Sequence, residues 1–228
     1  FELTGEGSSQ WLENLITGNL PKVGKTSLIY FASPKGKVLT EMTATRIGED
    51  HYWLLTGAGA YWHDRDWLNF NLPNKSKISI SDNTKEVCTL LLTGPKSEDL
   101  ISNLSEEKMD KDNFPWLSHK LCSLNGNKCR ILKVSYAGEK GYEIHAPNDN
   151  FANIYDQIIL EGKKHNLIHF GMLALDSMRL EKNYRSWKSD LTSDYSILES
   201  GLRKWINFKK ENFIGKESLT KEHSVGLT

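Results

Sequence analysis

The sequence has no excess of charge of either sign. Lysine plus arginine total 29 residues, as do aspartate plus glutamate, so the formal net charge is zero. A surface that binds nucleic acid generally needs a basic excess. The sequence therefore predicts no nucleic-acid partner, and the charge balance says nothing against a small anionic ligand.

Cysteine is scarce, and its spacing argues against the common thiolate metal sites. Cys88, Cys122 and Cys129 form no C-x-x-C pair, and the histidines are scattered. A structural zinc site needs closely spaced ligands, so we expect no metal site. Buried, reduced thiols suit a reducing compartment. We therefore expect a cytoplasmic location in a bacterium, or the mitochondrial matrix in a eukaryote.

Long apolar runs are also missing. No run reaches membrane-spanning length and no signal-like start is visible, so no membrane partner is expected. The 228 residues have an ordinary composition and are enough for one large domain or two small ones. The chain opens on Phe1 in a strand-like pattern and stops just after Leu227, so both ends look cut from something longer.

Two segments of the sequence resemble each other. Residues 3–8 run into 11–15, and residues 92–97 run into 100–104, each with the pattern of a strand, a glycine turn and a short amphipathic helix. More strand-like sequence and another helix follow both. The repeated order predicts a duplication and an α+β fold with two related lobes. Clefts between such lobes hold ligands.

The remaining elements follow from apolar periodicity and turn residues. Residues 105–113, the most polar stretch, are expected at the surface as a helix or a loop. Strands are expected at 27–31, 38–46, 51–56, 120–123, 128–135 and 141–145, and helices at 60–72, 151–165 and 171–181.

A hairpin is expected between Tyr136 and Glu143, with a tight turn at Gly138 and Gly141. Glu143 lies between two large apolar residues, and a carboxylate in a half-buried strand is costly unless it has a partner. A carboxylate can accept two parallel hydrogen bonds from an amidine-like edge, and a tyrosine can stack on a flat heterocycle. The pair therefore suits a pterin or a similar base. Spacing alone favours a simpler alternative, a cross-strand tyrosine and a glutamate paired with a nearby lysine.

Two other charged residues interrupt apolar patterns. Arg179 lies between apolar residues on a predicted helix. Its guanidinium is either a donor to a carboxylate at a functional site, or it pairs within the chain with Asp176, three residues earlier, or with a strand carboxylate. The sequence favours neither. Glu41 lies inside a strand, where it is either a general base, a group that stabilises a developing cation, or an exposed glutamate, which the position by itself favours. His63 and Asp64 are expected in a surface cluster.

Four motifs extend over nearly the whole chain, with support from residues 36–43, 55–64 and 179–187. They are Tyr136-x-Gly138-Glu139-x-Gly141-x-Glu143-Ile144, Ala174-Leu175-x-x-x-Arg179-Leu180-Glu181-Lys182, Leu198-Glu199-x-Gly201-Leu202 and Phe213-Ile214-Gly215-Lys216. In order and spacing they resemble the glycine-cleavage T-protein (aminomethyltransferase) superfamily. The details look most similar to the folate-binding C-terminal region of dimethylglycine dehydrogenase.

The resemblance implies a fold in which two related α/β lobes and a small barrel surround a central channel that binds tetrahydrofolate. Residues 1–85 would be the first lobe, and residues 86–205 the second, folate-binding lobe. Residues 206–228 would begin a C-terminal barrel that is mostly missing from the sequence.

The resemblance also implies the site residues. Glu143 matches the carboxylate that grips the pterin, Tyr136 the aromatic residue beside it, and Arg179 an arginine near the folate. Trp187 lies in a segment similar to the dehydrogenases and joins this cofactor-binding set. Glu41 falls where aminomethyltransferases carry an essential aspartate next to the reacting folate nitrogens, so it is the expected catalytic residue.

The implied function is tetrahydrofolate-dependent one-carbon transfer. An iminium or formaldehyde unit from an N-methyl amine of the dimethylglycine type would be captured as 5,10-methylenetetrahydrofolate, with a carboxylate stabilising the cation. The alternatives are a glycine-cleavage aminomethyltransferase that works with a lipoyl carrier protein, and a non-catalytic folate-binding regulatory module. No G-x-G-x-x-G follows a predicted strand, so the oxidation is expected to need a flavin-dependent dehydrogenase domain as partner.

Overall fold

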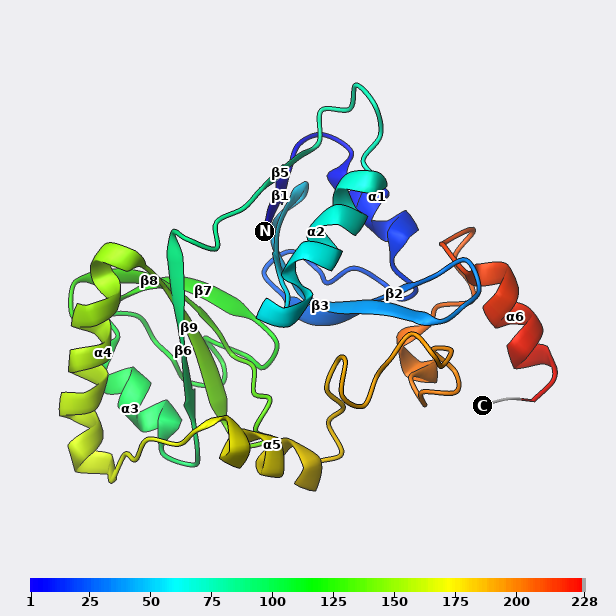
Figure 1. Cartoon of the computed structure of the whole chain (residues 1–228). Coiled ribbons are helices and arrows are strands. Elements are labelled where there is room, and N and C mark those ends of the chain that lie inside the picture. Colours follow the sequence, from blue (N-terminus) through cyan, green and yellow to red (C-terminus); the bar gives the residue numbers. More distant parts are fainter. Residues whose placement is uncertain (227–228) are drawn as a thin grey trace. The chain divides into compact units, whose positions relative to one another are not determined.

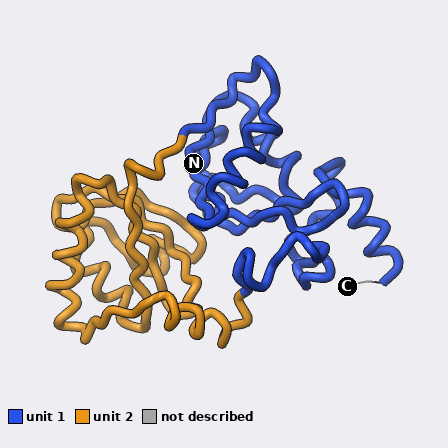
Figure 2. The backbone as a smooth tube through the Cα atoms, viewed as in Figure 1, with its two compact units in different colours: residues 1–81, 185–228 blue, residues 82–184 orange. Residues whose placement is uncertain are grey.

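The computed structural model describes residues 1–226, which form two compact units (Figure 2). The first unit joins Phe1–Ser81 to Arg185–Thr228, and the second is Asp82–Tyr184. Each unit has its own sheet and its own apolar core. The chain therefore leaves the first unit after Ser81 and returns to it at Arg185.

The first unit is built on a five-stranded antiparallel sheet (Figure 1). Its strands are β1 (Glu2–Thr4), β2 (Thr26–Ala32), β3 (Val38–Gly48), β4 (His51–Leu55) and β5 (Ser79–Ser81). Its helices are α1 (Ser8–Leu15), η1 (Ala58–Ala60), α2 (Tyr61–Phe70), η3 (Arg203–Trp205) and α6 (Lys216–Ser224). The strand order is β2-β3-β4-β1-β5, and the main core lies between this sheet and the helices α1 and α2.

Strand β3 shows how the sequence pattern builds this sheet. Alternate residues from Val38 to Ala44 are buried, and the residues between them, Glu41 included, are half-buried. Successive side chains of a strand point to opposite faces, so the predicted alternation is confirmed. On β2, Tyr30 lies directly opposite Glu41. The two side chains therefore share one face of the sheet.

The second unit is built on a four-stranded antiparallel sheet. Its strands are β6 (Val87–Thr93), β7 (His119–Leu124), β8 (Asn127–Leu132) and β9 (Gly141–Pro147), and its helices are α3 (Ser97–Leu104), α4 (Asn148–Gly162), η2 (Lys163–His165) and α5 (Met172–Glu181). The strand order is β6-β9-β8-β7, and α3 and α4 lie on one face of the sheet (Figure 1). The apolar core fills the space between that face and the two helices.

The two units repeat one topology. The order β1-β4-β3-β2 in the first matches β6-β9-β8-β7 in the second. In each, the first strand passes through a glycine with positive φ, Gly5 at +107° or Gly94 at +123°, into a short helix. Glycine adopts such a backbone without strain. A buried serine, Ser8 or Ser97, then donates its N–H to that glycine's carbonyl. The predicted pair of related lobes is confirmed.

The C-terminal segment packs on the first unit. The Val38 N–H donates to the Tyr195 carbonyl at 3.0 Å, and Lys37 Nζ lies 3.2 Å from Glu199 Oε2. Residues 185–205, placed with the second lobe on the sequence alone, therefore pack against the sheet of the first unit.

Two local features differ from the sequence prediction. Strand β8 ends at Leu132, so its connection to β9 is longer than the expected tight turn, and Tyr136 lies in this connection. The short strand β5 was not predicted. Its three residues are too few to show a period, and the strand forms by pairing with β1.

Candidate functional site

Glu143 extends from β9 on the sheet face opposite α3 and α4. Its neighbours Tyr142 and Ile144 are fully buried in the core on the helix side, so side-chain alternation directs Glu143 to the other face. Leu91 on β6 and Leu132 on β8 lie directly opposite it. The Glu143 side chain is 29% exposed, so a ligand can reach its carboxylate.

The partner of Glu143 is a histidine. His145 Nε2 lies 3.2 Å from Glu143 Oε2, and His145 Nδ1 lies 2.9 Å from Thr89 Oγ1. The lysine pair that spacing alone favours is not formed within residues 1–226. An ionised carboxylate has about four lone-pair sites, so the contact with His145 leaves capacity for further donors. The sequence did contain a signal for His145, because residues two apart on a strand share a face.

Tyr136 lies in the β8–β9 connection and not on a strand. The simpler alternative of a cross-strand tyrosine is wrong, because the β8 residue directly opposite Glu143 is Leu132. The Tyr136 ring instead stacks on Tyr184, with centroids 6.5 Å apart and an interplanar angle of 18°. The two rings form an aromatic surface of the kind on which a flat ring stacks.

Arg179 is buried in the last turn of α5. Its Nε and Nη2 atoms each lie 2.7 Å from Asp176 Oδ1, and its Nη1 donates to the Tyr184 carbonyl at 3.0 Å. Of the two alternatives left open by the sequence, the pair with Asp176 is therefore formed. Because Tyr184 stacks on Tyr136, the structure brings Arg179 and Tyr136 together through Tyr184.

In the first unit, the half-buried residue Glu41 has a carboxyl group with incomplete hydrogen bonding. Burial raises the pKa of Glu41, and a hydrogen bond from the Tyr30 hydroxyl lowers this pKa in part. Within residues 1–226, Glu41 Oε2 is buried and has no hydrogen-bond partner. The alternative of an exposed glutamate is therefore wrong. A buried acceptor without a donor is costly, and carboxyls with shifted pKa values are concentrated at functional sites.

Trp187 belongs to the same unit as Glu41. It forms a β-bridge with Leu191 and packs, half-buried, against an apolar cluster that includes Tyr30. In the described part of the chain its indole N–H is also buried without a partner. Tyr30 therefore connects the surroundings of the two residues, through a hydrogen bond to Glu41 and an apolar cluster shared with Trp187.

Asp64 was expected in a surface cluster, and that expectation is wrong. Its side chain is fully buried in the first turn of α2. His63 Nδ1 lies 2.8 Å from Asp64 Oδ1, and the Thr56 hydroxyl donates to Oδ2. A carboxylate near a helix N-terminus is stabilised by the helix dipole. These partners offset the desolvation of Asp64, and the sequence did not reveal them.

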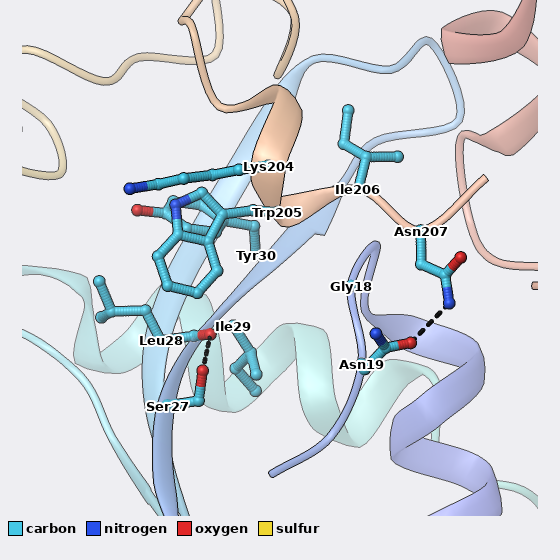
Figure 3. A pocket seen from close by; sticks show the side chains of 10 residues that line it. All are labelled: Gly18, Asn19, Ser27, Leu28, Ile29, Tyr30, Lys204, Trp205, Ile206 and Asn207. Atoms are coloured by element: carbon cyan, nitrogen blue, oxygen red, sulfur yellow. Dashed lines mark hydrogen bonds between the residues drawn. The ribbon is translucent and has the colours of Figure 1, made fainter. Parts of the chain in front are cut away.

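A cavity of about 250 Å³ opens beside Tyr30 (Figure 3). The Trp205 and Tyr30 rings have centroids 5.5 Å apart. Glu41 is not among the described residues that line the cavity, so the cavity borders the Tyr30–Glu41 pair without being the Glu41 site. Its walls come from residues 18–19, 27–30 and 204–207.

Across residues 1–226, no group of three or more histidine, cysteine or acidic side chains is arranged to hold a metal ion. No helix in this described range is long and apolar enough to cross a membrane. Cys122 and Cys129 are buried free thiols, and Cys88 is half-buried. Within the second unit, the candidate groups are thus the Glu143 carboxylate, which accepts hydrogen bonds, and the Tyr136 and Tyr184 rings, which offer a surface for stacking.

Comparison with known sequences gives matches along the whole chain. The family model of the GCVT N-terminal domain matches residues 1–210. The chain is 30% identical over 229 aligned residues to mitochondrial dimethylglycine dehydrogenase of Mus musculus, covering all of this chain and 26% of that protein. It is 28% identical to an aminomethyltransferase of Caldanaerobacter subterraneus subsp. tengcongensis, covering 98% of this chain and 60% of that protein. The chain therefore spans only part of the relatives' length.

Comparison with solved structures confirms the predicted fold class. The glycine cleavage system aminomethyltransferase T from Bartonella henselae superposes with a TM-score of 0.85 over 99% of this chain and 60% of that one. The sequence identity of this pair is 19%, so the likeness concerns the fold alone.

Proposed function

Because the chain belongs to the family of GCVT N-terminal domains, we propose that it binds tetrahydrofolate and takes part in one-carbon transfer. The family uses tetrahydrofolate. When bound, tetrahydrofolate accepts the one-carbon unit and becomes 5,10-methylenetetrahydrofolate. The residues proposed to hold it are Tyr136, Glu143, Arg179 and Trp187.

Each of these residues offers a different interaction. The Glu143 carboxylate retains lone pairs for the donor edge of a pterin. The stacked rings of Tyr136 and Tyr184 offer an aromatic surface. Arg179 acts through the carbonyl of Tyr184, which it holds in place. The unpartnered indole N–H of Trp187 can donate to a polar atom of the ligand.

The observation that carries the proposal is the buried Glu41 Oε2 without a hydrogen-bond partner. An iminium is cationic, and a carboxylate held in a low-dielectric site stabilises positive charge that develops during its capture. The raised pKa of Glu41, caused by burial, also brings the carboxyl nearer the pH range in which it can both take up and release a proton. Glu41 is therefore the proposed catalytic residue.

The proposed donor is an N-methyl amine of the dimethylglycine type, because a dimethylglycine dehydrogenase is among the relatives. Oxidation of the amine would require a flavin-dependent dehydrogenase domain as partner. Similarity to aminomethyltransferases supports a second candidate, transfer of an aminomethyl group from a lipoyl carrier protein. The proposed location is the cytoplasm of a bacterium or the mitochondrial matrix of a eukaryote.

The test compares Glu41→Gln with the parent in the full chain. Glu217→Gln is the matched control, because Glu217 lies on α6 with its side chain exposed. Two quantities are measured for each protein: the affinity for 5-formyltetrahydrofolate, and the rate of 5,10-methylenetetrahydrofolate formation. The donor is either dimethylglycine together with a flavin-dependent dehydrogenase that oxidises it, or an aminomethylated lipoyl carrier.

We expect Glu41→Gln to bind the folate within about twofold of the parent and to form product about 100-fold more slowly, the cost of losing one preorganised electrostatic group. The donor that supports product formation in the parent decides between the two candidates. A parent that binds folate but forms product from neither donor would support a non-catalytic module instead. Equal rates for Glu41→Gln and the parent would remove Glu41 from the mechanism.

A further inference from the structure

We propose that His145 positions the Glu143 carboxylate for its ligand by donating from Nε2, and that Thr89 holds the other ring nitrogen of His145. The inference rests on the proposed folate-binding role of Glu143. It concerns a residue that touches Glu143 and not the ligand, so His145 is a positioning residue.

The geometry that supports this role is a chain of three side chains across two strands. His145 lies directly opposite Thr89 in the pairing of β9 with β6. Its ring is 2% exposed, with Nδ1 2.9 Å from Thr89 Oγ1 and Nε2 3.2 Å from Glu143 Oε2. Both ring nitrogens are therefore in contact with polar partners, and burial fixes the ring between them.

The chemistry of the partners assigns the proton. An ionised carboxylate only accepts hydrogen bonds, so His145 Nε2 must carry the hydrogen that points at Glu143. In a neutral imidazole the other nitrogen is then an acceptor. The hydroxyl of Thr89 can donate a hydrogen bond to this acceptor, His145 Nδ1. The order of donation thus runs from Thr89 to His145 to Glu143.

This arrangement has a consequence for binding. A glutamate side chain has several rotamers, and ordering it on binding costs free energy. His145 holds one carboxylate oxygen in advance and leaves the remaining lone pairs to the ligand. Ligand-binding carboxylates and histidines are commonly held in this way by a second hydrogen bond behind them.

The test uses two variants that differ by one methylene. In His145→Gln the amide nitrogen takes the place of Nε2 and still donates to Glu143. In His145→Asn the amide nitrogen takes the place of Nδ1 and cannot reach Glu143. We expect the affinity for 5-formyltetrahydrofolate to stay within about threefold for His145→Gln and to fall about tenfold for His145→Asn, the loss typical of one hydrogen bond. Thermal unfolding of each variant checks that it is folded.

A second measurement does not depend on the variants folding. Nitrogen-15 NMR of the ligand-free parent should show a hydrogen on His145 Nε2. A His145 Nε2 without a hydrogen in the parent would overturn the inference. Equal affinities for His145→Gln and His145→Asn, in a parent whose affinity depends on Glu143, would overturn the inference and leave the proposed function intact. A parent without folate affinity would overturn the proposed function, and with it the ligand role of His145.

Discussion

Tyr30 and Glu41 lie directly opposite each other on β2 and β3, and the Tyr30 hydroxyl donates a hydrogen bond to the Glu41 carboxyl. The remaining oxygen of Glu41 is buried without a donor in the described range 1–226. Burial and the Tyr30 hydrogen bond therefore shift the pKa of Glu41, the proposed catalytic residue, in opposite directions.

Tyr30→Phe should shift the pH dependence of product formation. Burial raises the pKa of Glu41 and the Tyr30 hydrogen bond lowers this pKa, so removing the hydroxyl raises the pKa further. Because Glu41 is proposed to act as a carboxylate, the rate falls as pH decreases through its pKa, and in Tyr30→Phe this fall should begin at a higher pH. Tyr195→Phe, at an exposed tyrosine of the same unit, is the control. If the fall in rate at low pH occurs at the same pH in Tyr30→Phe as in the parent, or at a lower pH, the result would contradict the hydrogen bond between Tyr30 and Glu41.

Glu41→Gln should stabilise the protein at neutral pH. The pKa of Glu41 is higher in the folded than in the unfolded chain, so its contribution to stability is present below the unfolded pKa and is lost as pH rises through the folded pKa. A neutral glutamine avoids that loss, and we expect a gain of about 1 kcal/mol in the free energy of unfolding. Urea denaturation at pH 5 and pH 8 measures it. A gain that is larger at pH 5 than at pH 8 would have the wrong sign.

Arg179→Lys should weaken both folding and folate binding through Tyr184. Lysine lacks the planar fork that contacts Asp176 and the Tyr184 carbonyl together, so the free energy of unfolding should fall by about 1–2 kcal/mol. Asp176→Ala disturbs the same contacts and should reduce folate affinity by a similar factor. If Arg179 touched the folate directly, Arg179→Lys would reduce affinity far more than Asp176→Ala.

Gly138→Ala should reduce folate affinity, whereas Gly126→Ala should not. Both glycines have positive φ, +76° and +82°, so alanine costs about 1–2 kcal/mol at either position. A Cβ at Gly138 would also lie 2.2 Å from Lys182 Cγ, whereas nothing lies within 4 Å of one at Gly126. Only Gly138 lies in the β8–β9 connection that holds Tyr136. Calorimetric titration of both variants with 5-formyltetrahydrofolate checks this prediction. Equal affinities for Gly138→Ala and Gly126→Ala would show that the connection takes no part in folate binding.

The fold was largely predictable because its elements have local signals. The alternation around Glu41 and the glycine turns at Gly5 and Gly94 could all be read from neighbouring residues. The return of residues 185–205 to the first unit could not be predicted from neighbouring residues. It depends on contacts between positions that are far apart in the sequence, such as Val38 and Tyr195.

The site was predictable only in part. Glu41 and Glu143 were selected by resemblance to a family. The partner Tyr30 depends on the register of β2 with β3, which no motif specifies, whereas the only sequence signal for His145 was its position two residues from Glu143 on one strand. The stacking of Tyr136 on Tyr184 was not predictable either, because the two rings are far apart in the sequence and no local pattern links them.

The central claim is that Glu143 holds a reduced folate, and calorimetric titration with 5-formyltetrahydrofolate tests it most directly. The parent should bind, Glu143→Ala should bind about 100-fold more weakly because a charged acceptor is lost, and Glu106→Ala, at an exposed glutamate of the same unit, should bind like the parent. Equal affinities for Glu143→Ala and the parent, or a parent that does not bind, would contradict the claim.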